Sequence, residues 1–260
     1  MSLDSVVVKI FILTFLSFAI AMAWTPLLTH FLYKYKLGKQ IRDSALSPIF
    51  SKLHKSKSGT PTMGGVLIWV TVAGLALFIY LFSLWFNSYF SALNFLTRPQ
   101  TLLPLGCLVA AALVGLVDDY LNIRKIGPYG GGLSVTHRLA VYTVIAVVAA
   151  FWFYFRLDWD LIRIPFVGNF FIGWWFIPAV IFIIVGTAFS VNEIDGLDGL
   201  AGGTLLIAYI SFAIIAFMQG RFDLAAFCGV IAGALLAFLW FNIMPARFFM
   251  GDTGAMSLGV

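Results

Sequence analysis

The chain has 260 residues, of which 62% are hydrophobic and only 10% are charged, and its mean hydropathy is +1.00. This composition leaves too little polar surface to cover a soluble globular domain, so it indicates an integral membrane protein. The formal net charge of +5 comes mostly from basic residues between apolar runs, and nothing in the sequence points to a nucleic-acid partner.

Seven apolar runs are long enough to cross a bilayer, which takes about 20 helical residues. They show no two-residue alternation, which favours helices over a barrel. The sequence therefore predicts an all-α bundle within one transmembrane domain, residues 1–260, with an eighth helix beginning near Ala255. The seven runs are residues 10–29, 66–86, 102–117, 139–155, 170–189, 200–219 and 224–243.

The connections between these runs differ in charge. Most of the sixteen Lys and Arg residues lie in the first, third and seventh connections. The positive-inside rule places these connections in the cytoplasm and the N-terminus outside. Residues 156–169, between the fourth and fifth runs, alternate in polarity and predict a small hairpin on the outer face.

Acidic residues gather in three connections that are all predicted to be cytoplasmic. Each has a structural alternative, since Asp198 or Asp252 could cap the next helix and Asp-Gly pairs also form turns. Two adjacent acids near a helix C-terminus, as in G-L-V-D-D-Y, are harder to explain by capping because they oppose the helix dipole. The carboxylates are Asp118, Asp119, Glu193, Asp195, Asp198 and Asp252, six of the chain's eleven acids.

Carboxylates that meet at a membrane interface must share a cation or a proton. Their oxygens suit Mg²⁺ or Mn²⁺, which often binds one or two carboxylates together with water and phosphate. The motif H-K-S-K-S-G-T-P-T-M-G-G, residues 54–65, has two interpretations. It forms either a tight turn before the second run or an anion pocket made by Lys57, threonine hydroxyls and free backbone amides. Metal and phosphate together indicate phosphoryl transfer.

Four motifs in this order resemble the polyprenyl-phosphate N-acetylhexosamine-1-phosphate transferases. They are the 54–65 motif, G-L-V-D-D-Y, N-E-I-D-G-L-D-G-L-A and P-A-R-F-F-M-G-D-T-G. The G-T-P-T-M-G-G form favours the muramoyl-pentapeptide branch. The resemblance implies that undecaprenyl phosphate attacks UDP-N-acetylmuramoyl-pentapeptide with Mg²⁺, giving lipid I and UMP in peptidoglycan synthesis. It also implies a multi-pass protein of the bacterial inner membrane, and a homodimer is compatible with it.

The resemblance also implies residue roles. Asp252 matches the metal ligand, with Asp195 beside it, and Asp118 matches the candidate base that deprotonates the lipid phosphate. The other implied catalytic residues are Asp119, Asn192, Asp195, Asp198 and Arg138. The implied nucleoside pocket contains Lys57, Thr62, Asp198, Asn242 and Phe249, where an aromatic ring would stack on uracil.

Two features depart from the family pattern. Arg138 stands where the family usually has Lys; it keeps the positive charge but binds phosphate as a planar fork. The family also has about ten spans and a His-rich cytoplasmic loop, and this chain ends at Val260 before either. We expect the chain to be truncated at its C-terminus and inactive until the remaining portion is supplied.

Other functions explain the sequence less well. A transferase that uses UDP-N-acetylglucosamine is the nearest alternative. A proton-coupled transporter would place ionisable residues at mid-membrane depth, and the seven runs contain no Asp, Glu, Lys, Arg or His. A CDP-alcohol phosphotransferase would need Asp-Gly-x-x-Ala-Arg, which follows neither Asp195 nor Asp198. A non-catalytic scaffold would leave the acidic connections unexplained.

Overall fold

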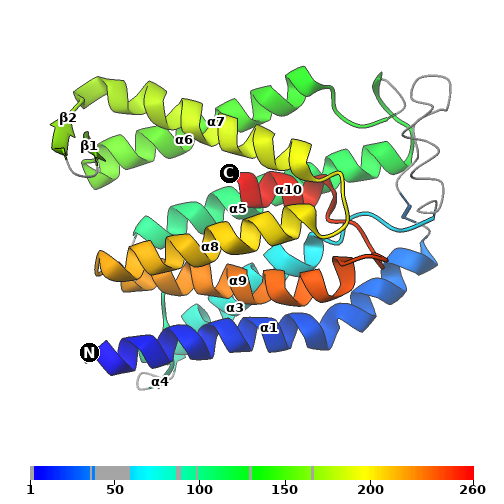
Figure 1. The fold of residues 1–260 in the computed structure, drawn as a ribbon, viewed down its shortest axis with the longest axis horizontal. Coiled ribbons are helices and arrows are strands. Elements are labelled where there is room, and N and C mark those ends of the chain that lie inside the picture. The colour runs from blue at the N-terminus through cyan, green and yellow to red at the C-terminus, as the bar shows by residue number, and fades with distance from the viewer. Residues whose placement is uncertain are drawn as a thin grey trace.

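The structure is a computed structural model that describes residues 3–35, 37–38, 59–85, 89–97, 99–128, 131–164 and 167–260. Within these ranges, seven helices are long and apolar enough to cross a membrane, which confirms the predicted polytopic helical bundle. The long helices run roughly along one direction, so that their ends gather at two opposite ends of the molecule (Figure 1). The site described below lies at one of these ends.

The elements follow one another along the chain, and the connection from α1 to α3, residues 35–65, is the longest. The helices are α1 (Leu3–Lys34), α3 (Val66–Trp85), α4 (Tyr89–Leu93), α5 (Pro99–Ile123), α6 (Val135–Leu157), α7 (Phe176–Ile194), α8 (Leu200–Met218), α9 (Phe222–Asn242) and α10 (Gly251–Gly259). Between α6 and α7 lie strands β1 (Leu161–Ile164) and β2 (Gly168–Phe171) and the 3₁₀ helix η3 (Gly173–Trp175).

Helix α9 forms the centre of the bundle. It is apolar on all sides, as expected of a helix surrounded by others, and it packs against α1, α3 and α8. Small residues allow close approach to α1: a Cβ at Gly233 would collide with the backbone of Thr14. Peripheral helices instead expose large apolar side chains, such as Phe182 on α7 and Ile207 on α8.

The predicted hairpin is present and lies at one end of the bundle. Strands β1 and β2 pair antiparallel, with Leu161 opposite Phe171 and Ile164 opposite Gly168. Figure 1 shows the hairpin at the end of the bundle opposite to the point where α10 begins. We call this end the hairpin end.

Several helix boundaries differ from the predicted runs. The predicted fifth run began at residue 170, but residues 170–171 belong to β2 and α7 begins at Phe176. Helix α7 then continues to Ile194, and α5 continues to Ile123. Both helices extend past their apolar stretch because no Gly or Pro interrupts them there and polar side chains are accommodated near the membrane surface.

Helix α10 is short and buried along its length between α5 and α7. It begins at Gly251, four residues before the predicted start at Ala255. Gly115 of α5 makes the close approach possible, because a Cβ there would collide with the carbonyl oxygen of Asp252. The packing of α10 thereby carries Asp252 from a loop into the interior of the bundle.

Candidate active site

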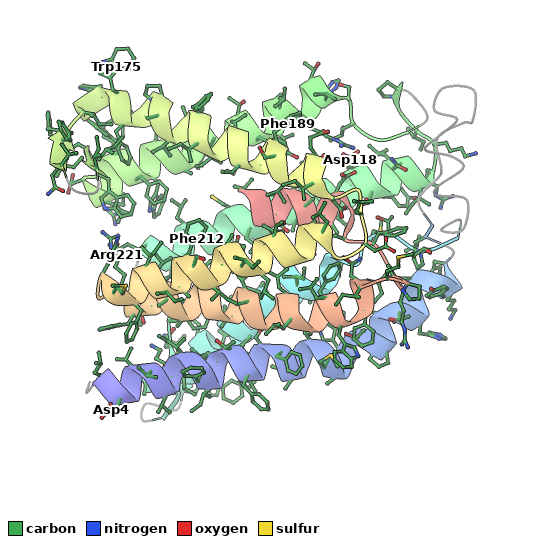
Figure 2. All side chains as sticks on the ribbon, in the orientation of Figure 1. Asp4, Asp118, Trp175, Phe189, Phe212 and Arg221 are labelled. Carbon is green, nitrogen blue, oxygen red and sulfur yellow. The ribbon has the colours of Figure 1, made fainter. Side chains whose placement is uncertain are left out.

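The acidic residues of α5 and α10 meet at the end of the bundle opposite to the hairpin. Asp118 is fully buried, and Asp119 and Asp252 are almost so. Figure 2 shows Asp118 well separated from Trp175 and Arg221, which lie at the hairpin end. We call the region around Asp118, Asp119 and Asp252 the acidic end. A carboxylate this deeply buried needs compensating donors or cations.

Asp118 receives its partners from the start of α6. The Leu133 backbone N–H donates to its Oδ1 at 2.5 Å, and Arg138 Nε lies 2.7 Å from its Oδ2. The Nε–Oδ2 contact is an ion pair between a guanidinium and a carboxylate. Ser134 begins α6 by accepting a hydrogen bond from the His137 N–H.

Arg138 connects three of the predicted catalytic or metal-binding residues. Besides its ion pair with Asp118, it donates from Nη1 to Asn192 Oδ1 at 3.0 Å and from Nη2 to Asp252 Oδ2 at 3.1 Å. Asn192 Nδ2 also donates to Asp252 Oδ1 at 3.0 Å, which closes a ring of three side chains. A guanidinium can serve three partners at once because its donors form a fixed planar fork.

Asp119, the neighbour of Asp118 on α5, faces a different set of partners. The Thr253 backbone N–H donates to its Oδ2 at 3.0 Å, and the Thr62 hydroxyl donates to its Oδ1 at 3.3 Å. Successive side chains on a helix point about 100° apart, so Asp118 and Asp119 contact different elements. Asp118 contacts the start of α6, and Asp119 links α10 to the loop before α3 by hydrogen bonds.

The loops on either side of this contact are hydrogen-bonded to each other. The Phe249 N–H donates to the Pro61 carbonyl, and the Gly64 and Gly65 N–H groups donate to the Phe249 and Met250 carbonyls, each at 2.8 Å. The prediction that this loop offers free amides to an anion is therefore wrong at Gly64 and Gly65. Lys57, the predicted cation of this motif, lies outside the described residues.

Gly251 forms the tight turn that starts α10. Its φ of +75° lies in the left-handed region, and a Cβ there would lie 2.5 Å from Asp119 Oδ2 and 2.6 Å from Thr62 Oγ1. Its N–H donates to Asp195 Oδ2 at 3.2 Å. The turn therefore places Asp195, from the end of α7, next to the residue that precedes Asp252.

The predicted nucleoside residues lie beside this turn. Asn242 is buried; its Oδ1 accepts from the Gly199 N–H and its Nδ2 donates to the Phe248 carbonyl, both at 2.9 Å. Phe249 and Asp198 are half-buried. The N-cap residue of α8 is Gly199 rather than Asp198. Asp252 likewise does not cap α10, which Met250 precedes.

Two polar residues of the site were not predicted. Thr253 holds Asp119 through its backbone, and its hydroxyl donates to the Ala112 carbonyl at 2.9 Å and accepts from Trp69 Nε1 at 3.2 Å. Tyr142, one turn after Arg138 on α6, is fully buried, and its hydroxyl has no hydrogen-bond partner among the described residues. The i, i+4 spacing of Tyr142 and Arg138 is the only sequence signal that places it here.

The donor set can be compared with what a divalent cation requires. Within the described residues, no group of three or more His, Cys, Asp and Glu side chains could hold a metal ion. Mg²⁺ at phosphate sites uses one or two carboxylates and completes its shell with water and phosphate oxygens. Asp252, with Asp195 bonded to the backbone of the preceding residue Gly251, is compatible with that smaller requirement.

The fold and the acidic end together define a class of protein: a multi-pass helical membrane protein with buried carboxylates gathered at one end of the bundle. Residues 101–260 match the family model described as glycosyl transferase family 4. Residues 57–68 match phospho-N-acetylmuramoyl-pentapeptide-transferase signature 1. The chain belongs to glycosyl transferase family 4.

Curated relatives carry a consistent name. A phospho-N-acetylmuramoyl-pentapeptide-transferase of Chloroflexus aggregans is 39% identical over 237 residues, which cover 88% of this chain and 59% of that protein. Proteins of the same name from Bacillus subtilis and Shouchella clausii are 37% and 39% identical, each over 94% of this chain and 70% of their own length. The chain thus spans about three fifths of the Chloroflexus relative it matches.

Proposed function

We propose that the protein transfers phospho-N-acetylmuramoyl-pentapeptide from its UDP derivative to undecaprenyl phosphate, giving lipid I and UMP. The observation that carries the proposal is the ring of Arg138, Asn192 and Asp252, with Asp118 paired to the same guanidinium. The muramoyl-pentapeptide signature at residues 57–68 and the names of the relatives favour this sugar nucleotide over UDP-N-acetylglucosamine.

The transfer is a displacement at the β-phosphorus of the sugar nucleotide. An oxygen of the lipid phosphate forms a new bond to this phosphorus, the bond to the bridging oxygen breaks, and UMP leaves with that oxygen. Asp118 is the proposed base that accepts the proton of the lipid phosphate. Because a carboxylate accepts a proton poorly while it is paired with a cation, Asp118 acts once its contact with Arg138 has loosened.

Mg²⁺ is the proposed cofactor, held by Asp252 with Asp195 nearby. When bound, it would neutralise the charge of the diphosphate and so favour attack by an anionic nucleophile. This chain's own residues orient that site: Asn192 fixes one oxygen of Asp252, and Asp119 fixes α10 through the Thr253 N–H. Thr62, Asn242, Phe249 and Asp198 would face the nucleoside, together with Lys57.

We propose that the acidic end faces the cytoplasm of a bacterial inner membrane, with the N-terminus and the hairpin outside. The basic first connection enters the bundle at this same end, since α1 ends at Lys34 and α3 begins at Val66. This orientation agrees with the positive-inside rule. It also places the site where a soluble UDP-linked precursor can reach it, while the polyprenyl chain stays in lipid.

The proposal is tested by measuring UMP release. The full-length protein is purified and incubated with undecaprenyl phosphate, Mg²⁺ and either UDP-N-acetylmuramoyl-pentapeptide or UDP-N-acetylglucosamine. We expect UMP release with the first sugar nucleotide and none above background with the second. Release only with UDP-N-acetylglucosamine would overturn the substrate assignment. The variant Arg221→Gln, at the hairpin end, serves as a matched control that should retain activity.

A further inference from the structure

The acidic end already contains a cation of its own. Among the described residues, Arg138 is the basic side chain in ion-pair contact with the acids of the site, at 2.7 Å from Asp118 and 3.1 Å from Asp252. The side chains of Asp118 and Asp252 are 0% and 7% exposed. Two carboxylates so withdrawn from water repel each other and need a positive charge between them.

Both oxygens of Asp252, the proposed metal ligand, already have partners. Asp252 Oδ1 accepts from Asn192 and Oδ2 accepts from Arg138 Nη2. A divalent ion bound to Asp252 would lie within a few ångströms of the guanidinium. In a site this poorly hydrated, the repulsion between the two cations is strong. Metal binding to Asp252 and the Arg138–Asp252 ion pair therefore compete.

We infer that Arg138 is an internal counter-cation, which holds Asp252 against metal binding until an anionic diphosphate enters and draws the guanidinium away. This inference rests on the proposed function, because it takes a nucleoside diphosphate as the incoming anion. Guanidinium groups bind phosphate oxygens through two parallel hydrogen bonds, so the diphosphate offers Arg138 a partner at least as good as Asp252.

Arg138 is also the most exposed of the three charged side chains. Its side chain is 21% exposed, whereas those of Asp118 and Asp252 are 0% and 7% exposed. An anion that enters the acidic end can therefore contact the guanidinium directly.

The consequence is cooperative binding. If the diphosphate removes a cation that opposes the metal, then each ligand must raise the affinity of the other by the same factor. Arg138 acts here as a positioning residue and as the source of this coupling. Removal of its charge should strengthen metal binding in the absence of nucleotide and abolish most of the coupling.

The test measures Mn²⁺ binding by the electron paramagnetic resonance signal of free Mn²⁺, with the protein in lipid nanodiscs. Wild type, Arg138→Gln and Arg138→Lys are compared with and without UDP, and Asp252→Asn provides the blank for Mn²⁺ bound by UDP alone. Arg221→Gln controls for loss of an arginine elsewhere. The midpoint of thermal unfolding confirms that each variant is folded.

We expect Arg138→Gln to bind Mn²⁺ at least tenfold more tightly than wild type without UDP. We expect UDP to tighten Mn²⁺ binding at least tenfold in wild type and less than threefold in Arg138→Gln. Arg138→Lys, which keeps the charge, should stay within about threefold of wild type without UDP, because the repulsion depends on charge rather than on shape.

Equal or weaker Mn²⁺ binding by a folded Arg138→Gln would overturn the inference. If that variant does not fold, the wild-type measurement decides, since UDP that leaves Mn²⁺ affinity unchanged would overturn the inference equally. A wild-type protein that binds Mn²⁺ at Asp252 but shows no coupling leaves the proposed function standing. A full-length wild-type protein that binds no Mn²⁺ with or without UDP refutes the proposed function itself.

Discussion

Arg138 Nη2 lies 3.1 Å from Asp252 Oδ2, although 114 positions separate the two residues in the chain. The first belongs to the opening turn of α6 and the second to the opening turn of α10. Helix α10 is buried between α5 and α7. The contact between Arg138 and Asp252 therefore joins two helices that are far apart in the chain. The acidic end is therefore assembled by helix packing rather than by any single motif.

Asp252→Asn should abolish metal-dependent UMP release without unfolding the protein. The amide keeps the shape of the side chain and one oxygen, but it loses the charge that a divalent ion requires. Thermal unfolding and UMP release are measured on the same preparation. Asp4→Asn removes a carboxylate from the exposed start of α1 and should leave both unchanged. Unchanged activity in Asp252→Asn would remove this residue from the metal site.

Gly251→Ala should destabilise the protein and lower its activity. The Cβ would meet Asp119 Oδ2 and Thr62 Oγ1 at a residue whose φ is +75°, so we expect a loss of at least about 2 kcal/mol in the free energy of unfolding. Gly203→Ala on α8 is the matched control, because nothing lies within 4 Å of its Cβ position. That change should be neutral or stabilise by roughly 0.5–1 kcal/mol. Similar losses in both variants would contradict the structure of the turn.

Tyr142→Phe should fold at least as stably as wild type. The buried hydroxyl has no partner among the described residues, so its removal costs no hydrogen bond and can raise the free energy of unfolding by up to about 1 kcal/mol. Tyr209→Phe gives the contrast, because the Tyr209 hydroxyl donates to the Leu258 carbonyl at 3.0 Å. That variant should lose about 1 kcal/mol. The comparison uses thermal unfolding in the same detergent, and equal losses would show that Tyr142 has a partner.

Lys9→Met should destabilise the hairpin end of the bundle. Lys9 is buried in α1, and its Nζ donates to the Asn94 carbonyl at 2.8 Å and to Asp223 Oδ1 at 3.1 Å. Removal of one member of a buried ion pair leaves the other uncompensated, at a cost of roughly 3 kcal/mol. The double variant with Asp223→Leu should recover part of this loss in thermal unfolding. Additive losses would show that the two side chains do not interact.

Some features of this protein are local properties of the chain, and the sequence was sufficient for them. Within the described part of the chain, the seven helices long and apolar enough to span a membrane were predicted correctly, as was the hairpin between the fourth and fifth runs. Apolar run length and residue alternation are set by neighbouring residues. The apolar runs predicted the helix boundaries less well, because a helix continues into polar residues until a residue unfavourable to helix, such as Gly or Pro, ends it. Asn192 was therefore expected in a loop, and it lies in the last turn of α7.

Tertiary structure alone decided how the site residues meet. Sequence predicted that Asp118 and Asp252 would lie at the same end, but not that both would contact Arg138, or that Thr253 and Tyr142 would join them. These relationships depend on how far each helix is rotated about its axis and how deeply α10 inserts between α5 and α7. Rotation and depth are fixed by packing among segments far apart in the chain, so no local pattern of residues could specify them.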